Sequence, residues 1–178
     1  MNLGGLTDRA RMAAGQRFSH SIRTRLALDE VGNWALDRAD GTITHDFSGW
    51  DNHGTIHLGT GDNTNLAAAF VPGVHGQAMS FDGVDDRVSI PNAINLNPNN
   101  ITIELWYFPR NVFITTIQGQ IRKELSYIIQ HGIEVGRLRP HIHSGGTWHI
   151  MEANNYLTAN NTWYHVVVTY NGVAGIMN

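Results

Sequence analysis

The chain contains no cysteine among its 178 residues. Disulfide bonds, thiolate metal sites and cysteine nucleophiles are therefore excluded. Charge is also scarce, because 12 Lys and Arg and 15 Asp and Glu make up 15% of the residues and leave a net charge of −3. An ordinary globular chain carries about 25% charged residues. This composition excludes a disordered chain and a coiled coil, and it gives no electrostatic basis for binding nucleic acid.

Long hydrophobic runs are missing as well. No stretch approaches the roughly 18 consecutive apolar residues that suggest a membrane-spanning helix, and the first residues show no signal-peptide pattern. Glycine, in contrast, is abundant, with 19 residues. Together with Asn and Asp it marks tight turns between many short elements. The length fits about one domain of ~150 residues with a core of its own.

A helix is predicted between Leu6 and Leu28, because apolar residues recur there at every fourth position. These residues are Ala10, Ala14, Phe18, Ile22 and Leu26. Thr7 can cap the helix, and arginines cover the rest of its surface. We therefore treat residues 1–30 as an N-terminal amphipathic helix.

After Val31 the pattern changes to short apolar runs separated by Gly, Asn, Asp and Pro. It predicts strands at residues 33–36, 54–58, 78–81, 86–90, 101–108, 113–117, 125–130, 138–143, 148–153 and 163–170. Many short strands at this spacing are typical of an antiparallel β-sandwich or barrel. The sequence therefore predicts a mainly β fold after a single helix.

Five segments, taken in order, carry a family resemblance. They are residues 31–37, 46–55, 71–86, 101–109 and 162–172. The second contains an Asp-x-Ser-Gly loop, the third a Phe-Asp-Gly-x-Asp-Asp turn and the fifth a Trp-x-His-Val-x-x-Thr-Tyr strand. In this order they resemble the laminin-G-like domains of the concanavalin-A-like lectin/glucanase superfamily. The resemblance implies an antiparallel two-sheet jelly-roll sandwich over residues 31–178.

The chain departs from the family pattern in two places. The family continues with further strands after the turn at residues 170–172, so we expect a sandwich short of its closing strands. The N-terminal helix would then fill the gap, or a second copy of the chain would fill it by self-association. The other departure is Asp51, which stands where the family has Gly. Aspartate tolerates a left-handed backbone, so we expect the loop to be preserved.

The resemblance also implies a structural calcium ion. Loops 46–54 and 82–86 concentrate carboxylates and amides, and calcium takes six to eight oxygen ligands from such turns. The residues that we expect to bind it are Asp46, Asn52, Asp82 and Asp85. In the alternative, these side chains only cap turns by bonding to nearby backbone amides.

A ligand platform is predicted on the hairpin around Gly145 and Gly146. His141 and His143 alternate along a strand, so both imidazoles face one side. A two-residue Gly-Gly loop would pair His143 with Trp148 and place His149 on the opposite face, which disfavours a three-histidine metal site. His141, His143 and Trp148 would then form a surface for stacking a sugar ring. The alternatives are an exposed sheet face without a ligand and a transition-metal site at the two histidines.

Two further candidates lie on the strand at residues 101–108. Glu104 and Trp106 share one face of it and could contribute to ligand binding. His165 shares a face with Trp163, and the same histidine type in the family indicates a structural role.

The sequence offers little support for catalysis. Glycosidases need two carboxylates that flank the scissile bond. The alternating acidic motif of the glucanase branch is absent, because the strand at residues 101–109 contains Glu104 as its single acid. No Gly-x-Ser-x-Gly nucleophile elbow occurs, and Glu134 and Glu152 are isolated in the sequence.

The leading hypothesis is a non-catalytic, calcium-stabilised module outside the cell or at its surface that binds glycans or surface polymers in adhesion. The arginine-rich helix followed by a sandwich gives a second hypothesis, the head domain of a pilin-like or surface-displayed subunit. The third is a hydrolase on the same scaffold. Binding to nucleic acid and a membrane span within this chain are not expected.

Overall fold

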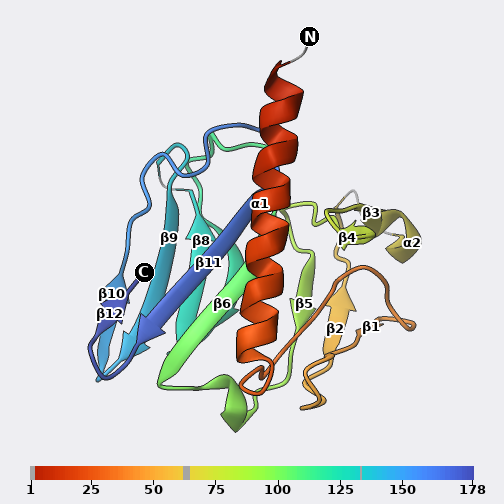
Figure 1. The fold of residues 1–178 in the computed structure, drawn as a ribbon. Helices are drawn as coiled ribbons and strands as arrows, with labels where there is room; N and C mark the ends of the chain where they lie inside the picture. The colour runs from red at the N-terminus through yellow and green to blue at the C-terminus, as the bar shows by residue number, and fades with distance from the viewer. Residues whose placement is uncertain (1–2, 62–64, 133) are drawn as a thin grey trace. The chain divides into compact units, whose positions relative to one another are not determined.

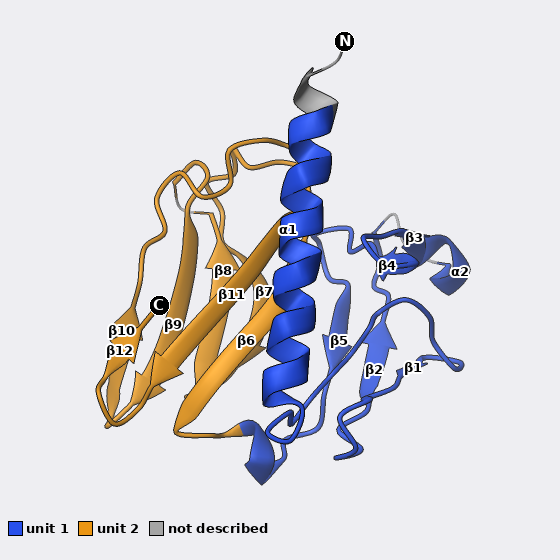
Figure 2. Cartoon of the chain, viewed as in Figure 1, with its two compact units in different colours: residues 1–96 blue, residues 97–178 orange. Residues whose placement is uncertain are grey.

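A computed structural model describes residues 3–61, 65–132 and 134–178. The chain divides into two compact units, residues 1–96 and residues 97–178 (Figure 2). We describe each unit by itself.

Unit 1 combines a long helix with two small antiparallel sheets (Figure 1). Its elements are helix α1 (Leu3–Leu26), strands β1 (Ile43–Thr44), β2 (Gly54–His57), β3 (Phe70–Pro72), β4 (Gln77–Met79) and β5 (Arg87–Ser89), helix α2 (Leu66–Ala69) and the 3-10 turn η1 (Ile94–Leu96). One sheet has the order β1-β2-β5, and β3 pairs with β4 in the other. The glycine- and aspartate-rich loops between these short strands carry much of the unit's polar chemistry.

Helix α1 forms as predicted, but it turns a different face inward. Phe18 and Leu26 are exposed, whereas Ser19 is buried and Met12 and Ile22 are half-buried. The reason is geometric. A step of four residues advances about 40° beyond a full helical turn, so residues spaced strictly by four wind around the helix. The predicted stripe was therefore wrong for the exposed members, Ala10, Ala14, Phe18 and Leu26. Among the described residues, no helix is both long enough and apolar enough to cross a membrane.

Unit 2 is a two-layer antiparallel sandwich (Figure 1). Its strands are β6 (Asn100–Tyr107), β7 (Gln118–Lys123), β8 (Tyr127–His131), β9 (Leu138–Ser144), β10 (Thr147–Ile150), β11 (Tyr164–Asn171) and β12 (Ile176–Met177). One sheet has the order β10-β9-β8-β7 and the other β12-β11-β6. The mainly β sandwich class predicted from the sequence is confirmed.

The core of unit 2 lies between these two sheets. Ile103, Val166 and Val168 point inward from β6 and β11, and Ile129 and Leu138 point inward from β8 and β9. In β11, buried and half-buried residues alternate from Tyr164 to Tyr170, as expected when one face of a sheet meets a core. Each fully buried aliphatic side chain contributes about 1.5–3 kcal/mol, which makes this core the main source of stability of the unit.

Some strand predictions were wrong in position. Residues 113–117 form no strand, and Phe113 and Ile117 are exposed. The strand β7 follows at Gln118–Lys123 instead. It is the edge strand of its sheet and pairs with β8 alone, so it does not need a continuous apolar face, and hydrophobic periodicity does not reveal it. Residues 33–36 contribute an isolated bridge from Trp34 to Asp46 rather than a strand.

Candidate functional site

The hairpin of β9 and β10 forms with the register that the sequence predicts. Trp148 lies opposite His143, and His149 lies opposite Ile142. Gly145 and Gly146 connect the strands with φ angles of 59° and 78°. Two consecutive positive φ angles are the mark of a type I′ turn, the two-residue loop whose twist matches that of the paired strands. The two glycines thus set which side chains lie on each face of the hairpin.

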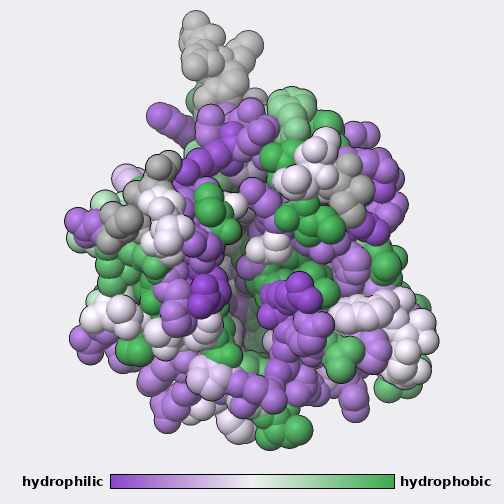
Figure 3. Space-filling model, turned by 180° about the vertical axis from the view of Figure 1, so that it is seen from behind, coloured by the Kyte–Doolittle hydropathy of each residue, from purple (hydrophilic) through white to green (hydrophobic). Residues whose placement is uncertain are grey.

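His141, His143 and Trp148 come together on the outer face of the four-stranded sheet, and we call them the platform. The ring centroids of His143 and Trp148 are 5.0 Å apart at 59°, and those of His141 and Trp148 are 6.3 Å apart at 77°. All three side chains are half-buried. Seen from behind, the described residues present hydrophobic and hydrophilic side chains intermingled (Figure 3). The platform likewise combines the apolar indole ring of Trp148 with the polar ring nitrogens of His141 and His143.

The environment of His141 favours the neutral imidazole. Burial lowers its pKa, the charge of Arg139 lowers it further, and Glu152 raises it by less. The Nε2 atom of Gln130 lies 3.1 Å from Nε2 of His141, so the amide donates to the unprotonated ring nitrogen. The remaining nitrogen of His141 then carries the hydrogen. His141 therefore offers the platform a hydrogen-bond donor without a positive charge.

His149 lies on the opposite face of the hairpin, with its ring centroid 5.6 Å from that of Tyr170. The three histidines of the hairpin thus do not gather. In the described part of the chain, the group of three or more metal-ligating side chains contains neither His141 nor His143. The arrangement gives the platform no third ligand for a transition metal.

Arg137 joins two glutamates that are far apart in the sequence. Arg137 pairs with Glu134, and its Nη1 lies 3.0 Å from Oε2 of Glu152. Arg139 approaches the other oxygen of Glu152 at 3.4 Å. Both carboxylates are thus engaged by arginines. The pair is therefore suited to a structural ion-pair cluster rather than to one proton-donating acid and one nucleophile.

Glu104 and Trp106 lie on the outer face of the other sheet of the sandwich, so the predicted ligand residues form two separate clusters. Nε2 of His165 lies 2.7 Å from Oε1 of Glu104, and the rings of Trp106 and His165 stack with centroids 4.7 Å apart. The side chains of His165 and Glu104 are only 11% and 18% exposed. This compact set fits the structural role predicted for His165 better than a surface for a large ligand.

A polar group lies inside the sandwich, and most of it has no signal in the sequence. His131 is 1% exposed, and its Nδ1 lies 3.2 Å from the hydroxyl of Tyr107, which also accepts a hydrogen bond from Gln120. Burial raises the pKa of Tyr107 to about 12, although the Gln120 bond lowers it slightly. Burial also lowers the pKa of His131, and a backbone contact with Val112 opposes this by less. The one sequence signal was Tyr107, which follows Ile103 and Leu105 on the inward face of its strand.

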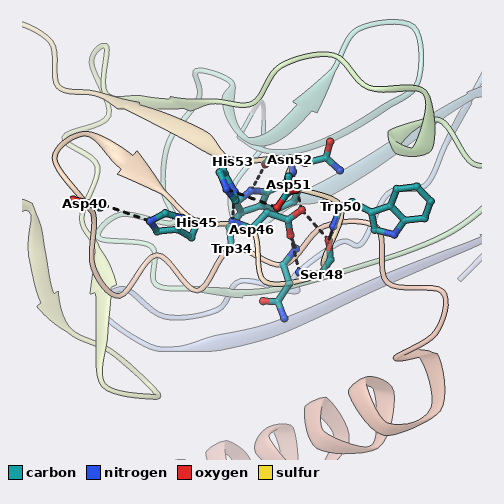
Figure 4. A network of polar contacts seen from close by, with 10 residues as sticks. Trp34, Asp40, His45, Asp46, Ser48, Trp50, Asp51, Asn52 and His53 are labelled. Atoms are coloured by element: carbon teal, nitrogen blue, oxygen red, sulfur yellow. Dashed lines mark hydrogen bonds and ion pairs between the residues drawn. The ribbon is translucent and has the colours of Figure 1, made fainter.

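In unit 1, Asp46 organises loop 46–54 (Figure 4). Its Oδ1 accepts backbone hydrogen bonds from Asn33 and Ser48 at 2.8 and 2.9 Å, and its Oδ2 accepts from Ser48 Oγ and the Asn52 backbone at 2.8 and 3.0 Å. Burial raises the pKa of Asp46, but these hydrogen bonds more than offset it, so the pKa is lowered. Both oxygens are occupied by protein donors, as the turn-capping alternative describes. Asn52 likewise uses its amide, which donates to the Val31 carbonyl.

The acidic loop at residues 82–86 gathers three carboxylates. Oxygens of Asp82, Asp85 and Asp86 lie within 4.8 Å of one another, in a group that does not include Asp46. Oδ2 of Asp82 is buried without a hydrogen-bond partner. A Cβ at Gly59 would collide with the carboxylate of Asp85, so the backbone at that position approaches the cluster as only glycine allows. The donor set and its charge fit a hard cation such as calcium.

Comparison with known proteins bears on unit 2 and on this acidic loop. A laminin G model, described as the concanavalin A-like lectin/glucanases superfamily, matches residues 82–177. The search of curated proteins and the search of solved structures found no match.

Proposed function

Because the chain belongs to the concanavalin A-like lectin/glucanase superfamily, we propose that it is a non-catalytic carbohydrate-binding module with the platform as its binding surface. The observation that carries this proposal is the convergence of His141, His143 and Trp148 on one sheet face. The indole ring would stack on the apolar face of a sugar, and the two imidazoles would exchange hydrogen bonds with its hydroxyl groups.

The electrostatics of the platform favour an uncharged ligand. The lowered pKa of His141 keeps its ring neutral at neutral pH, so its remaining N–H can donate a hydrogen bond to a ligand without adding a positive charge. The nearby arginines are engaged by Glu134 and Glu152, which reduces their attraction for an acidic polymer. We therefore expect glycans or neutral surface polymers as partners, with the module acting in adhesion outside the cell or at its surface.

The proposal is tested by the substitution Trp148→Ala. The intact protein is first applied to a glycan array, and the best ligand is then titrated by calorimetry. The substitution should lower the affinity at least tenfold, because the stacking of a sugar ring on the indole is expected to be a principal contact. Phe113→Ala removes an exposed aromatic ring elsewhere in the unit and should leave affinity unchanged. Equal affinity of the Trp148→Ala protein and the unchanged protein would contradict the proposal.

We further propose that calcium stabilises unit 1 at Asp82, Asp85 and Asp86. The ion would supply the positive charge that three clustered carboxylates need, and the buried Oδ2 of Asp82 offers a ligand atom that no protein group occupies. Adding a chelator should lower the melting temperature of the unchanged protein, and Asp82→Asn should remove that difference. Asp40→Asn, which changes a carboxylate that is 89% exposed, serves as the control. A melting temperature that does not respond to calcium would disprove this site.

A further inference from the structure

The segment at residues 45–53 of unit 1 carries four ring side chains that reach solvent. Phe47 and Trp50 are 53% and 58% exposed. The ring centroid of Phe47 lies 6.5 Å from that of His45, and the centroid of His45 lies 4.9 Å from that of His53. We call these four residues the aromatic strip. In Figure 4 the indole of Trp50 points away from the polar network around Asp46. Exposed aromatic rings that gather on one segment are a reason to look for a binding site there.

The loop that carries the strip is held in place from below. Besides the four hydrogen bonds to Asp46, the Nε1–H of Trp34 donates to the carbonyl of Asn52 at 2.8 Å, and the side-chain amide of Asn52 donates to Val31 at 2.9 Å. A loop that is already ordered loses little conformational entropy when a ligand binds. The rings are thus displayed on a pre-organised surface.

The backbone at Asp51 gives a second, independent indication. Asp51 has φ of 55°, in the left-handed region that glycine adopts without strain. Its carboxylate is 89% exposed, and Oδ1 lies 3.9 Å from Nε2 of His53. This separation is too long for a hydrogen bond. Aspartate tolerates this conformation, but glycine adopts it at a lower cost, and residues outside the usual backbone regions cluster at functional sites.

The geometry around Asp51 fits a hydroxyl group. Nδ1 of His53 accepts the backbone N–H of Asp46 at 3.1 Å, so the neutral ring carries its hydrogen on Nε2. That N–H and the Asp51 carboxylate then form a donor and an acceptor 3.9 Å apart. A hydroxyl oxygen about 2.8 Å from both atoms can accept from His53 and donate to Asp51. Beside them, a Cβ at Gly49 would meet no atom within 4 Å, so the surface there is open to a ligand.

We propose that the aromatic strip and Asp51 form a second saccharide-binding site, specific for a neutral chain of sugar residues. Trp50 and Phe47 would stack on sugar rings, and Asp51 with His53 would hold a hydroxyl group. Arg38, whose Cζ lies 5.9 Å from the centroid of the Phe47 ring, brings one positive charge to the strip. The exposed carboxylates of Asp51 and Asp40 outnumber it and would disfavour acidic sugars and anionic lipid surfaces. The proposal takes its ligand class from the function proposed above, but its residues lie in the other unit and do not depend on the platform.

Affinity electrophoresis of the intact protein provides the test. Native gels containing soluble β-glucan, mannan, xylan or polygalacturonate are compared for the unchanged protein and for Trp50→Ala, Asp51→Gly, Trp148→Ala and Phe113→Ala. We expect a neutral polysaccharide to retard the unchanged protein and Trp50→Ala to weaken that retardation at least fivefold. Asp51→Gly should also weaken it, with a melting temperature that is equal or higher because the left-handed backbone is relieved.

The outcomes separate the two proposals. If Trp50→Ala and Asp51→Gly are retarded like the unchanged protein while Trp148→Ala is not, the second site is refuted and the platform stands. If Trp50→Ala loses retardation and Trp148→Ala keeps it, the second site is supported and the platform is refuted. Retardation by polygalacturonate alone, or by no polysaccharide, would overturn the second site.

Discussion

At the scale of single residues, Asp46 shows how one side chain can fix a loop. Its buried carboxylate accepts four hydrogen bonds, and a buried donor left without its acceptor costs about 1–3 kcal/mol. We expect Asp46→Ala to lower the free energy of unfolding by roughly 2–4 kcal/mol. Urea denaturation monitored by tryptophan fluorescence measures it. Asp40→Asn, at an exposed carboxylate, should change stability little.

The same residue makes stability depend on acid. The folded-state pKa of Asp46 lies below the ordinary value of 3.8, so ionised Asp46 contributes stability that is complete above that value. This contribution is lost as the pH falls through the lower folded pKa. The difference in urea midpoint between the unchanged protein and Asp46→Ala should therefore shrink below pH 3.8. A difference that is constant down to pH 2 would contradict this assignment.

His131 also makes stability depend on pH, but here the folded state favours the neutral form of the side chain. Burial lowers its pKa below the ordinary 6.5, so the folded state holds the neutral ring while the unfolded state takes up a proton below that pH. Stability is complete above pH 6.5 and decreases as the pH falls from there towards the folded pKa. His131→Gln should reduce this decrease in a urea titration between pH 7 and pH 5. His141→Gln is the comparison, because the pKa of His141 is lowered too. Each variant should remove the contribution of its own histidine to the loss of stability at acid pH.

At the scale of elements, the β9–β10 hairpin depends on its turn. A residue with a Cβ at a positive φ angle destabilises the turn by about 1 kcal/mol. We expect Gly146→Ala, at φ of 78°, to lower stability by about that amount and to weaken binding at the platform, because His143 and Trp148 meet through this register. Gly119→Ala in the same sheet, where a Cβ would meet no atom within 4 Å, is the matched control. Unchanged affinity of Gly146→Ala in the glycan titration would argue against the register requirement.

The elements also show what the sequence could predict. Inner strands such as β11 were placed within one residue, because a core on one face imposes strict alternation on Tyr164, Val166 and Val168. The Gly-Gly turn fixed the register of Trp148 for a local reason. Contacts between distant segments had no such signal. The polar trio of Tyr107, Gln120 and His131 depends on how the two sheets pack, which periodicity does not encode. The link between Glu134 and Glu152 depends on the bridge that pairs Leu138 with Ala153.

At the scale of the whole molecule, the two units differ in how much core they contain. Among the residues that the structure describes, most of the buried hydrophobic side chains belong to unit 2, and most of these form one cluster. In unit 1, short strands are connected by polar loops that carboxylates hold together. We expect hydrogen exchange to be slowest in β6, β8, β9 and β11 and faster in the loops of unit 1.

Adding calcium should slow exchange selectively at residues 59–61 and 82–86, where backbone amides and carboxylates meet. The comparison is made by mass spectrometry of peptides with and without chelator. Uniform slowing in both units would indicate a general effect of salt instead of a local ion. An unchanged rate of exchange in these segments would count against the ion site, as would a melting temperature that does not respond to calcium.

The polar edge strand β7 has a consequence for colloidal behaviour. Edge strands with unpaired backbone groups invite association with other chains, and charged side chains on the edge prevent it. Arg122 and Lys123 stand at the end of β7, and Lys123 is the sole lysine of the sequence. Acylating reagents that target lysine would therefore neutralise a charge on this edge, and chemical labelling could turn a dispersed protein into one that forms fibres.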